Sequence, residues 1–423
     1  MTKPLPEPPV KLHTNILNLA VIIAALGYFV DIYDLLLFGI VRQSSLADLG
    51  YSGDDLLKKG TLLLNWQMGG MLLGGILWGI IGDKRGRLSV LFGSIFLYSV
   101  ANILNGTVQS LEMYATYRFI AGIGLAGELG AGITLVSEVM TKENRGYGTT
   151  IVAAFGIFGA VIAGLVGKVF DWRTAYYIGG GLGIMLLVLR AGAYESGMFN
   201  HIKKQGVSKG NFLAFFTNRE RFSKYIKVIL VGLPIWYVIG ILIFFAPELA
   251  QALHIGIDPL TGKTTITGRD AIMYQYAGAA TGALLCGLLS QYLKKRKRAL
   301  LYFMAGDAAC VLIYMLMRNA SAPAFYFFDF IFGIANGYWS VFMTVASEQF
   351  GTNIRATATT TTPNFVRGSV VPMTMMFVWL REITGDIVIA AIIVGIIVLT
   401  IAFIALWKTK ETYGRDLEYS EAI

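Results

Sequence analysis

Charged side chains interrupt several long apolar stretches of this 423-residue chain, and their types and spacing could do chemistry. A carboxylate placed in hydrocarbon costs about 2.5–3.5 kcal/mol even on permissive insertion scales. A charge that is kept there usually faces protein or water and serves a function. The candidates are therefore the charges set deepest in apolar sequence, namely Asp31, Asp34, Arg118, Glu128 and Arg367.

Asp31 and Asp34 stand three residues apart, so a helix places both carboxylates on one face. Two neighbouring acids in an apolar segment are typical of a group that loads and unloads a proton. A structural hydrogen bond between helices, or a sodium site, is the alternative. Arg118 lies at about the depth of Asp34 in a segment that runs the opposite way. This placement allows an ion pair between Arg118 and Asp34, in which the permanent positive charge of Arg118 favours release of the proton from Asp34.

Glu128 and Arg367 both lie near the middle of their segments. Glu128 could be a second proton site, a contact for a cationic substrate group, or a buried structural hydrogen bond. The Arg367 guanidinium could bind a carboxylate or phosphate through two parallel hydrogen bonds. A structural pair of Arg367 with Asp307 or Asp329 is the alternative. Arg190 lies near the end of its segment, so we expect its charge to extend toward water.

Aromatic and amide side chains in other apolar segments could complete a cavity around these charges. A few polar groups among aromatic rings are typical of small-molecule sites. For any single one of these residues, packing or anchoring of a helix at the membrane interface is the favoured role. They are Trp66, Gln67, Trp236, Tyr237, Tyr274, Gln275, Asn336, Tyr338, Trp339 and Asn364.

The composition indicates that the solvent around the chain is a lipid bilayer. Hydrophobic residues make up 55% of the chain and charged residues only 14%, against roughly 25% charged in soluble proteins. Apolar runs of about 20 residues, enough to cross a ~30 Å hydrocarbon core as helices, recur along the whole chain. We predict an all-α membrane protein with twelve transmembrane helices, at roughly 16–41, 61–82, 88–107, 113–139, 148–170, 174–193, 226–250, 271–293, 299–317, 322–347, 357–380 and 386–407.

The chain also repeats itself at half its length. Residues 137–150 and 347–360 share the pattern Ser-Glu, six residues, Arg, small, any, small, Thr-Thr. A repeat of this period in a membrane protein indicates a carrier with its site between two related halves. We therefore expect two pseudo-symmetric six-helix bundles at 1–193 and 226–407. A cytoplasmic linker with a surface helix would occupy 194–225, and a cytoplasmic tail 408–423.

Gly79, Asp83, Gly86 and Arg87 follow the second span in the pattern Gly-x-x-x-Asp-[Arg/Lys]-x-Gly-Arg. This pattern resembles the loop signature of the major facilitator superfamily, which also falls after the second span. The chain departs from both branches at one position each. Asp31 stands where the family's metabolite:proton symporters have Glu. Residues 195–197 read Glu-Ser-Gly, whereas sugar porters continue with Pro-Arg after Glu-Ser. Stretches similar to these two branches are Gly27–Asp34, Arg118–Gly130 and Glu411–Glu418.

The resemblance implies a carrier that opens its central cavity to the two sides in turn. It also implies that Arg118 takes part in proton coupling, and that a network at the cytoplasmic face controls opening. In the second half, Gln291 takes the place of Asp83, so the two gates should differ in strength. The implied gating residues are Gly79, Asp83, Gly86, Arg87, Glu138, Arg145, Glu348 and Arg355.

We expect a proton-coupled importer of a small organic anion. A proton-driven exporter of drugs or metabolites is the nearest alternative, and a non-transporting receptor of the same fold is another. An enzyme is not expected, because the sequence has no nucleophile–base set and no metal-ligand spacing. We expect no cofactor and no metal.

The net charge of +9 does not indicate a nucleic-acid partner, because most Lys and Arg residues fall in segments on one side of the predicted spans. That asymmetry marks the cytoplasmic side. We expect a multi-pass protein of the plasma membrane, in bacteria the inner membrane, with both termini cytoplasmic. Its partners would be the lipid bilayer, the substrate and protons, and it would function as a monomer.

Overall fold

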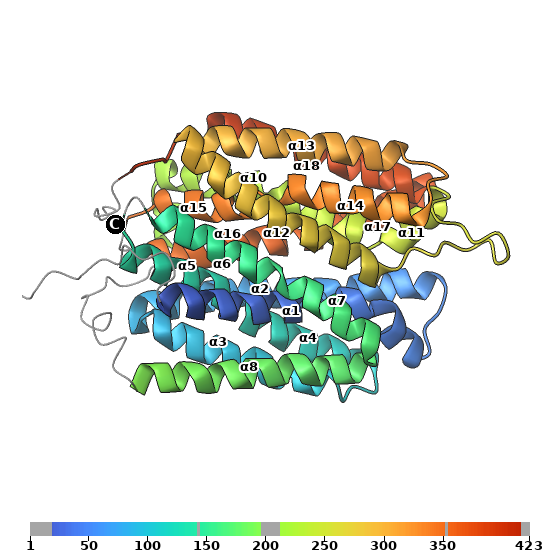
Figure 1. Ribbon diagram of the computed structural model, residues 1–423, viewed down its shortest axis with the longest axis horizontal. Helices are drawn as coiled ribbons and strands as arrows, with labels where there is room; N and C mark the ends of the chain where they lie inside the picture. The colour runs from blue at the N-terminus through green and yellow to red at the C-terminus, as the bar shows by residue number, and fades with distance from the viewer. Residues whose placement is uncertain (1–18, 142–143, 196–211, 352–353, 416–423) are drawn as a thin grey trace, which may run out of the picture.

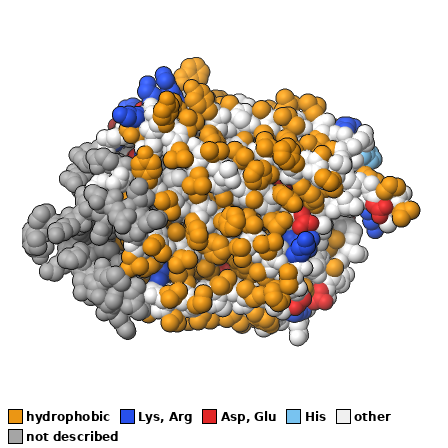
Figure 2. Space-filling view, viewed as in Figure 1, with side chains coloured by type: hydrophobic (Ala, Val, Ile, Leu, Met, Phe, Trp, Pro, Cys, Tyr) orange, Lys and Arg blue, Asp and Glu red, His pale blue; other side chains and the backbone are white. Residues whose placement is uncertain are grey.

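The computed structural model describes residues 19–141, 144–195, 212–351 and 354–415 of the chain. Within these residues the structure is helical apart from turns, short irregular stretches and isolated bridge residues, such as Ile257 and Thr264, which pair with each other. The helices run roughly parallel along the long axis of the molecule (Figure 1). Hydrophobic side chains cover the middle of the face seen in Figure 2, and charged ones lie mostly toward its two ends. This distribution suits a bilayer.

The first half of the chain forms six antiparallel segments. Two of them are each divided into two helices by a short break. The helices are α1 (Leu19–Asp48), α2 (Asp54–Arg85), α3 (Arg87–Asn105), α4 (Leu111–Leu125) with α5 (Glu128–Val139), α6 (Arg145–Ile157) with α7 (Gly159–Val169), and α8 (Trp172–Glu195).

The second half repeats this arrangement after a short helix, α9 (Ala214–Thr217), in the predicted linker. Its first long segment contains Pro234 and changes from α-helix to π-helix at Val238. The helices are α10 (Arg219–Tyr237) with η2 (Val238–Ile243) and α11 (Ala246–Ala252), α12 (Gly268–Leu293), α13 (Arg296–Leu316), α14 (Ala322–Asn336) with α15 (Trp339–Glu348), α16 (Arg355–Gly368) with α17 (Val370–Thr384), and α18 (Ile387–Lys408).

Ten of these segments are long and apolar enough to cross a membrane. The two others are α4–α5 and α16–α17, which carry Arg118, Glu128 and Arg367. We call the end of the molecule that holds the last turn of α18 and the turn at Gly86 the inner end, because it is predicted to be cytoplasmic. The opposite end, with the loop between α11 and α12, is the outer end (Figure 1).

Glycines bring pairs of helices into backbone contact within each half. In the first half, a Cβ on Gly70 of α2 would overlap the carbonyl oxygen of Phe119, and one on Gly122 of α4 would overlap that of Gln67. The second half repeats this contact between α12 and α14, where Gly278 faces Phe330 and Gly333 faces Gln275. Gly70 and Gly278 are 208 positions apart, which is close to the offset of the sequence repeat. Small residues permit such close approach of membrane helices.

The two halves meet along α1, α2, α5, α6 and α7 on one side and α12, α15, α16 and α17 on the other. α16 packs against α2 and α5, while α12 packs against α6 and α7. The short α9 lies where the sequence predicted a surface helix. Its Phe215 is buried and stacks on Tyr225 with ring centroids 4.5 Å apart, so this ring packs on protein.

We predict that Gly70→Val destabilises the protein by about 1–3 kcal/mol, because an added side chain forces α2 away from α4. The matched control is Gly69→Val, since a Cβ on Gly69 would meet no described atom within 4 Å. Thermal unfolding in detergent should show a lower midpoint for Gly70→Val than for Gly69→Val. Equal midpoints would contradict the backbone contact.

Candidate functional site

Asp31 of α1 and Arg367 of α16 meet at the centre of the molecule, one from each half. A carboxylate oxygen of Asp31 lies 3.7 Å from an Nη of Arg367, and both side chains are buried. This separation makes an ion pair but is too long for a hydrogen bond. Arg367 therefore pairs with an acid of the other half, and not with Asp307 or Asp329 of its own half, which were the structural alternatives.

Two tryptophans flank the Arg367 guanidinium. Its Cζ lies 5.8 Å from the ring centroid of Trp236 and 5.7 Å from that of Trp339, which is within cation–π range. None of its three guanidinium nitrogens has a hydrogen-bond partner among the described residues. The cation is thus held by ring faces and one carboxylate.

All three of these residues lie at interruptions of their helices. Arg367 is in the last turn of α16, directly before the break at Ser369. Trp339 is the first residue of α15, after the break at Gly337, and Trp236 precedes the π-helical turn that begins at Val238. Such irregular turns are frequent at functional sites. The C-terminal end of α16 also carries partial negative charge, which favours a cation there.

Two tyrosines that the sequence reasoning missed interact with Arg367. Tyr28 of α1 interacts electrostatically with both Arg367 and Asp31, and Tyr276 of α12 interacts with Arg367 and Tyr28. Tyr28 stands three residues before Asp31, hence on the same face of α1. That spacing could have identified it.

A second polar cluster surrounds Arg118 in the outer part of the first half. Arg118 donates to the side-chain oxygen of Gln67 and, at 3.5 Å, to the hydroxyl of Tyr176. No described ion pair joins Arg118 to Asp34, although the two interact electrostatically. The allowed ion pair is therefore not formed in this conformation, because Gln67 and Tyr176 accept the guanidinium protons instead.

Glu128 and Arg190 form a buried, two-pronged ion pair within the first half. One Nη of Arg190 donates to a Glu128 oxygen at 3.0 Å, and the second donates to the other oxygen. Arg190 also donates to the backbone carbonyls of Leu91 and Ile23, and its side chain is only 3% exposed. The expectation that Arg190 extends toward water is therefore wrong. Glu128 neutralises it in the interior, which favours the structural alternative for Glu128.

Most of the other residues proposed for the cavity have structural partners. The hydroxyl of Tyr237 donates to Ala391 at 2.8 Å, and that of Tyr338 to Val231 at 3.4 Å. The side-chain amide of Asn336 donates to Asp307 at 3.0 Å. Tyr274 and Trp66 are 40% and 46% exposed. The Asn364 amide donates to Ala126 at 2.7 Å and so joins the halves, while the buried amide of Gln275 has no partner among the described residues.

The halves are joined both above and below the central pair. Toward the outer end, Arg42 forms an ion pair with Glu248 at 2.7 Å, and the hydroxyl of Thr374 donates to Asn65 at 2.8 Å. Toward the inner end, the hydroxyls of Thr149 and Thr344 lie 3.3 Å apart. This conformation therefore encloses Asp31 and Arg367 between two layers of contact.

The structure describes only part of the implied gating network. Gly86 has a φ of 90°, a left-handed conformation that favours glycine in the turn between α2 and α3. Gly79 accepts a hydrogen bond from Thr357 at 3.4 Å, across the two halves. Arg355 donates to the carbonyl of Phe350 at 3.2 Å. The side chains of Asp83, Arg87, Glu138 and Arg145 lie outside those that the structure describes.

Glu348 joins a further cluster at the inner end. It forms an ion pair with Arg296 at 3.2 Å and accepts a hydrogen bond from Thr412 at 2.9 Å. The neighbouring Glu411 accepts hydrogen bonds from the backbone of Arg296 and Lys297 at the start of α13. The segment after α18 thus folds back onto the second half.

Residues 17–369 match the family model of the Major Facilitator Superfamily. The chain belongs to this superfamily. A protein of Haemophilus influenzae named for metabolite transport is 28% identical over 359 residues, covering 80% of this chain and 83% of that protein. The sialic acid transporter NanX of Escherichia coli is 26% identical over 322 residues, covering 73% of this chain and 74% of NanX.

The structure resembles that of the proton:xylose symporter XylE, with a TM-score of 0.69 and 16% identity, covering 94% of this chain and 97% of XylE. The predicted superfamily and the all-helical membrane fold are thereby confirmed. This superfamily member is a multi-pass secondary transporter of small metabolites and not an enzyme.

We predict that Glu128→Gln lowers the free energy of unfolding by about 3–5 kcal/mol, because it leaves the Arg190 guanidinium buried and unpaired. The double variant Glu128→Gln/Arg190→Met removes both charges and should recover part of this loss. Thermal unfolding of the two variants and of Arg190→Met in detergent provides the comparison. If the losses of stability in the two single variants simply add in the double variant, the predicted coupling between Glu128 and Arg190 is contradicted.

Proposed function

We propose that this transporter imports a small organic anion, bound through a carboxylate, together with a proton. The observation that carries the proposal is the Arg367 guanidinium, which is buried between the halves with no hydrogen-bond partner among the described residues. An arginine keeps its charge and presents N–H groups in a fork that fits a carboxylate. A site on the contact layer between the halves can open to either side in turn.

Charge balance gives a mechanism for the coupling. With Asp31 ionised, its negative charge neutralises Arg367 and competes with a substrate anion for the same cation. A proton on Asp31 removes that competition, and the substrate carboxylate then takes its place beside Arg367. The site has no net charge in either condition, so a proton and an anion are favoured to bind together. Neutrality matters because an uncompensated charge is costly in the interior.

The tryptophan pair supports the proposed anion site. Trp236 and Trp339 present apolar ring faces beside the cation, which excludes water and strengthens the interaction of Arg367 with an anion.

The similar proteins also support the proposal. The sialic acid transporter among the relatives supports an acid substrate, and the proton symporter among the similar structures supports proton coupling.

The proposed direction rests on the orientation of the chain. Exposed Lys294, Lys295 and Arg298 lie at the inner end, and cationic loops favour the cytoplasmic side. We therefore propose that the inner end, where α1 begins and α18 ends, is cytoplasmic. A proton gradient directed inward would then drive uptake.

We predict that Arg367→Ala weakens binding of carboxylate substrates by about 100-fold, because the buried cation that fixes the anion is lost. A thermal-shift screen of the wild-type protein with sialic acid and other carboxylic acids, against neutral sugars of similar size, identifies the ligand to be measured. Arg173→Ala is the control, since Arg173 lies at the outer end and is 34% exposed. Carboxylate affinity that survives in Arg367→Ala would assign Arg367 a structural role.

We predict that Asp31→Asn abolishes proton-driven accumulation while exchange of labelled for unlabelled substrate continues, because an amide in place of the carboxylate can neither compete for Arg367 nor bind a proton. Proteoliposomes with an imposed pH gradient measure accumulation, and counterflow at equal pH measures exchange. Asp34→Asn is compared in the same assays, because Asp34 is the other buried acid of α1. Normal accumulation by Asp31→Asn would move the coupling to another group.

A further inference from the structure

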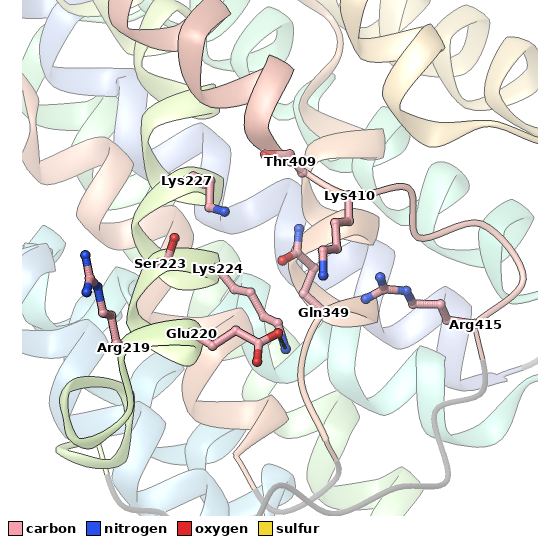
Figure 3. Close-up of a pocket in the computed structure, with 9 residues that line it drawn as sticks. All are labelled: Arg219, Glu220, Ser223, Lys224, Lys227, Gln349, Thr409, Lys410 and Arg415. Carbon is pink, nitrogen blue, oxygen red and sulfur yellow. Dashed lines mark ion pairs between the residues drawn. The ribbon is translucent and has the colours of Figure 1, made fainter.

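A basic pocket of about 430 Å³ opens at the inner end of the second half, away from the central pair (Figure 3). Three segments that are far apart in the sequence form it: the first turns of α10, the end of α15 at Gln349, and the residues that follow α18. Figure 3 shows basic side chains from α10 and from the segment after α18 gathered around it. Its basic residues are Arg219, Lys224, Lys227, Lys410 and Arg415.

The pocket has a large excess of positive charge. Five of its nine lining residues are basic and only Glu220 is acidic, a formal charge of +4 (five minus one). Glu220 lies 3.3 Å from Lys224, but its side chain is 69% exposed, so water screens this pair and it is weak. The lining residues themselves therefore contain only one weakly paired acid against five cations.

The general preference for cations on the cytoplasmic side does not explain this arrangement. That preference is satisfied by Lys or Arg anywhere in the inner loops, as with the exposed Lys295 and Arg298. Here, by contrast, basic residues nearly two hundred positions apart converge on one concave space. Bringing like charges together is unfavourable unless an anion neutralises them.

Exposed aromatic side chains stand near the pocket. Trp407, near the end of α18, is 82% exposed, and Phe222, in the first turn of α10, is 38% exposed. Exposed aromatic side chains at helix ends are typical of the membrane interface. In the sequence, Trp407 stands two positions before Thr409 of the pocket, and Phe222 stands next to Ser223 of the pocket.

From the volume, the charge and this position, we propose that the pocket binds a phosphate-bearing anion. Its volume is in the range of small-molecule sites, and several cations around one space suit a phosphate. The phosphate could belong to an anionic lipid of the inner leaflet or to a soluble phosphate ester.

The bound anion would also tie the inner end together. Gln349 follows Glu348, which pairs with Arg296, and Thr409 and Arg415 belong to the segment whose Thr412 donates to Glu348. An anion that contacts α10, Gln349 and this segment at once stabilises the closed arrangement of the inner end. The site is separate from the proposed carboxylate site at Arg367, so the two can be tested independently.

The test measures thermal unfolding of the full chain in nanodiscs of phosphatidylcholine, in two arms. One arm replaces part of the lipid with phosphatidylglycerol, and the other adds glycerol 3-phosphate to the buffer. We expect at least one arm to raise the midpoint of the wild-type protein, and the arm that does so identifies the source of the phosphate. The charge-removing variant is Lys224→Gln/Lys410→Gln, which should weaken the binding by about 30-fold, at roughly a fivefold loss per cation.

The matched control is Lys295→Gln/Arg298→Gln, which removes the same charge from the inner end outside the pocket. It should retain the stabilisation by the anion. Equal loss in both double variants, or no stabilisation of the wild-type protein in either arm, would overturn the proposal. Lys410→Gln alone changes one exposed side chain beyond α18 and repeats the test, with roughly a fivefold loss, should the double variant not fold.

Discussion

A charge buried in a membrane protein is costly unless it has a partner, and the architecture of this transporter depends on which buried charges are closely paired and which are not. Three of the buried arginines have a close carboxylate partner that fixes them in place. Arg367 differs from these three, because its acid lies 3.7 Å away and contributes no hydrogen bond. The close pairs are Arg42–Glu248 at the outer end, Arg190–Glu128 in the first half and Arg296–Glu348 at the inner end.

This difference separates the pair within one half, Arg190–Glu128, from the central pair between the halves. A close, two-pronged pair such as Arg190–Glu128 is costly to break and holds α5 to α8. A loose pair can exchange its carboxylate for that of a substrate at low cost. The loose pair is also the one that joins the two halves at the centre, where alternating access requires contacts to form and break.

The repeated glycine contacts make each half a firm unit, and the departures from symmetry give those units different chemistry. Gln67 accepts from Arg118 in the first half, whereas the corresponding Gln275 and Asp329 of the second half make no hydrogen bond among the described residues. The same backbone contact therefore positions a cation in one half and an acid in the other. Buried unpartnered groups of this kind are rare unless a ligand or a conformational change uses them.

The sequence by itself determined the membrane class, the helical segments, the two related halves and the depth of the buried charges. It could do so because hydropathy, helical spacing and a fixed-offset repeat are local properties of the chain. Arg367 was therefore recognised as a substrate candidate from its depth alone. Tyr28 could have been recognised from its spacing to Asp31.

Only the tertiary structure decided which charges meet. Arg118 bonds to Gln67 and not to Asp34, Arg190 turns inward to Glu128, and of the predicted aromatic residues only Trp236 and Trp339 flank Arg367. The physical reason is that depth in the membrane follows from position along a helix, whereas partners depend on the rotation of each helix about its axis. Packing against the neighbouring helices sets that rotation. Trp339 and Arg367 come together beside the breaks that precede α15 and follow α16, and no local pattern in the sequence records that convergence.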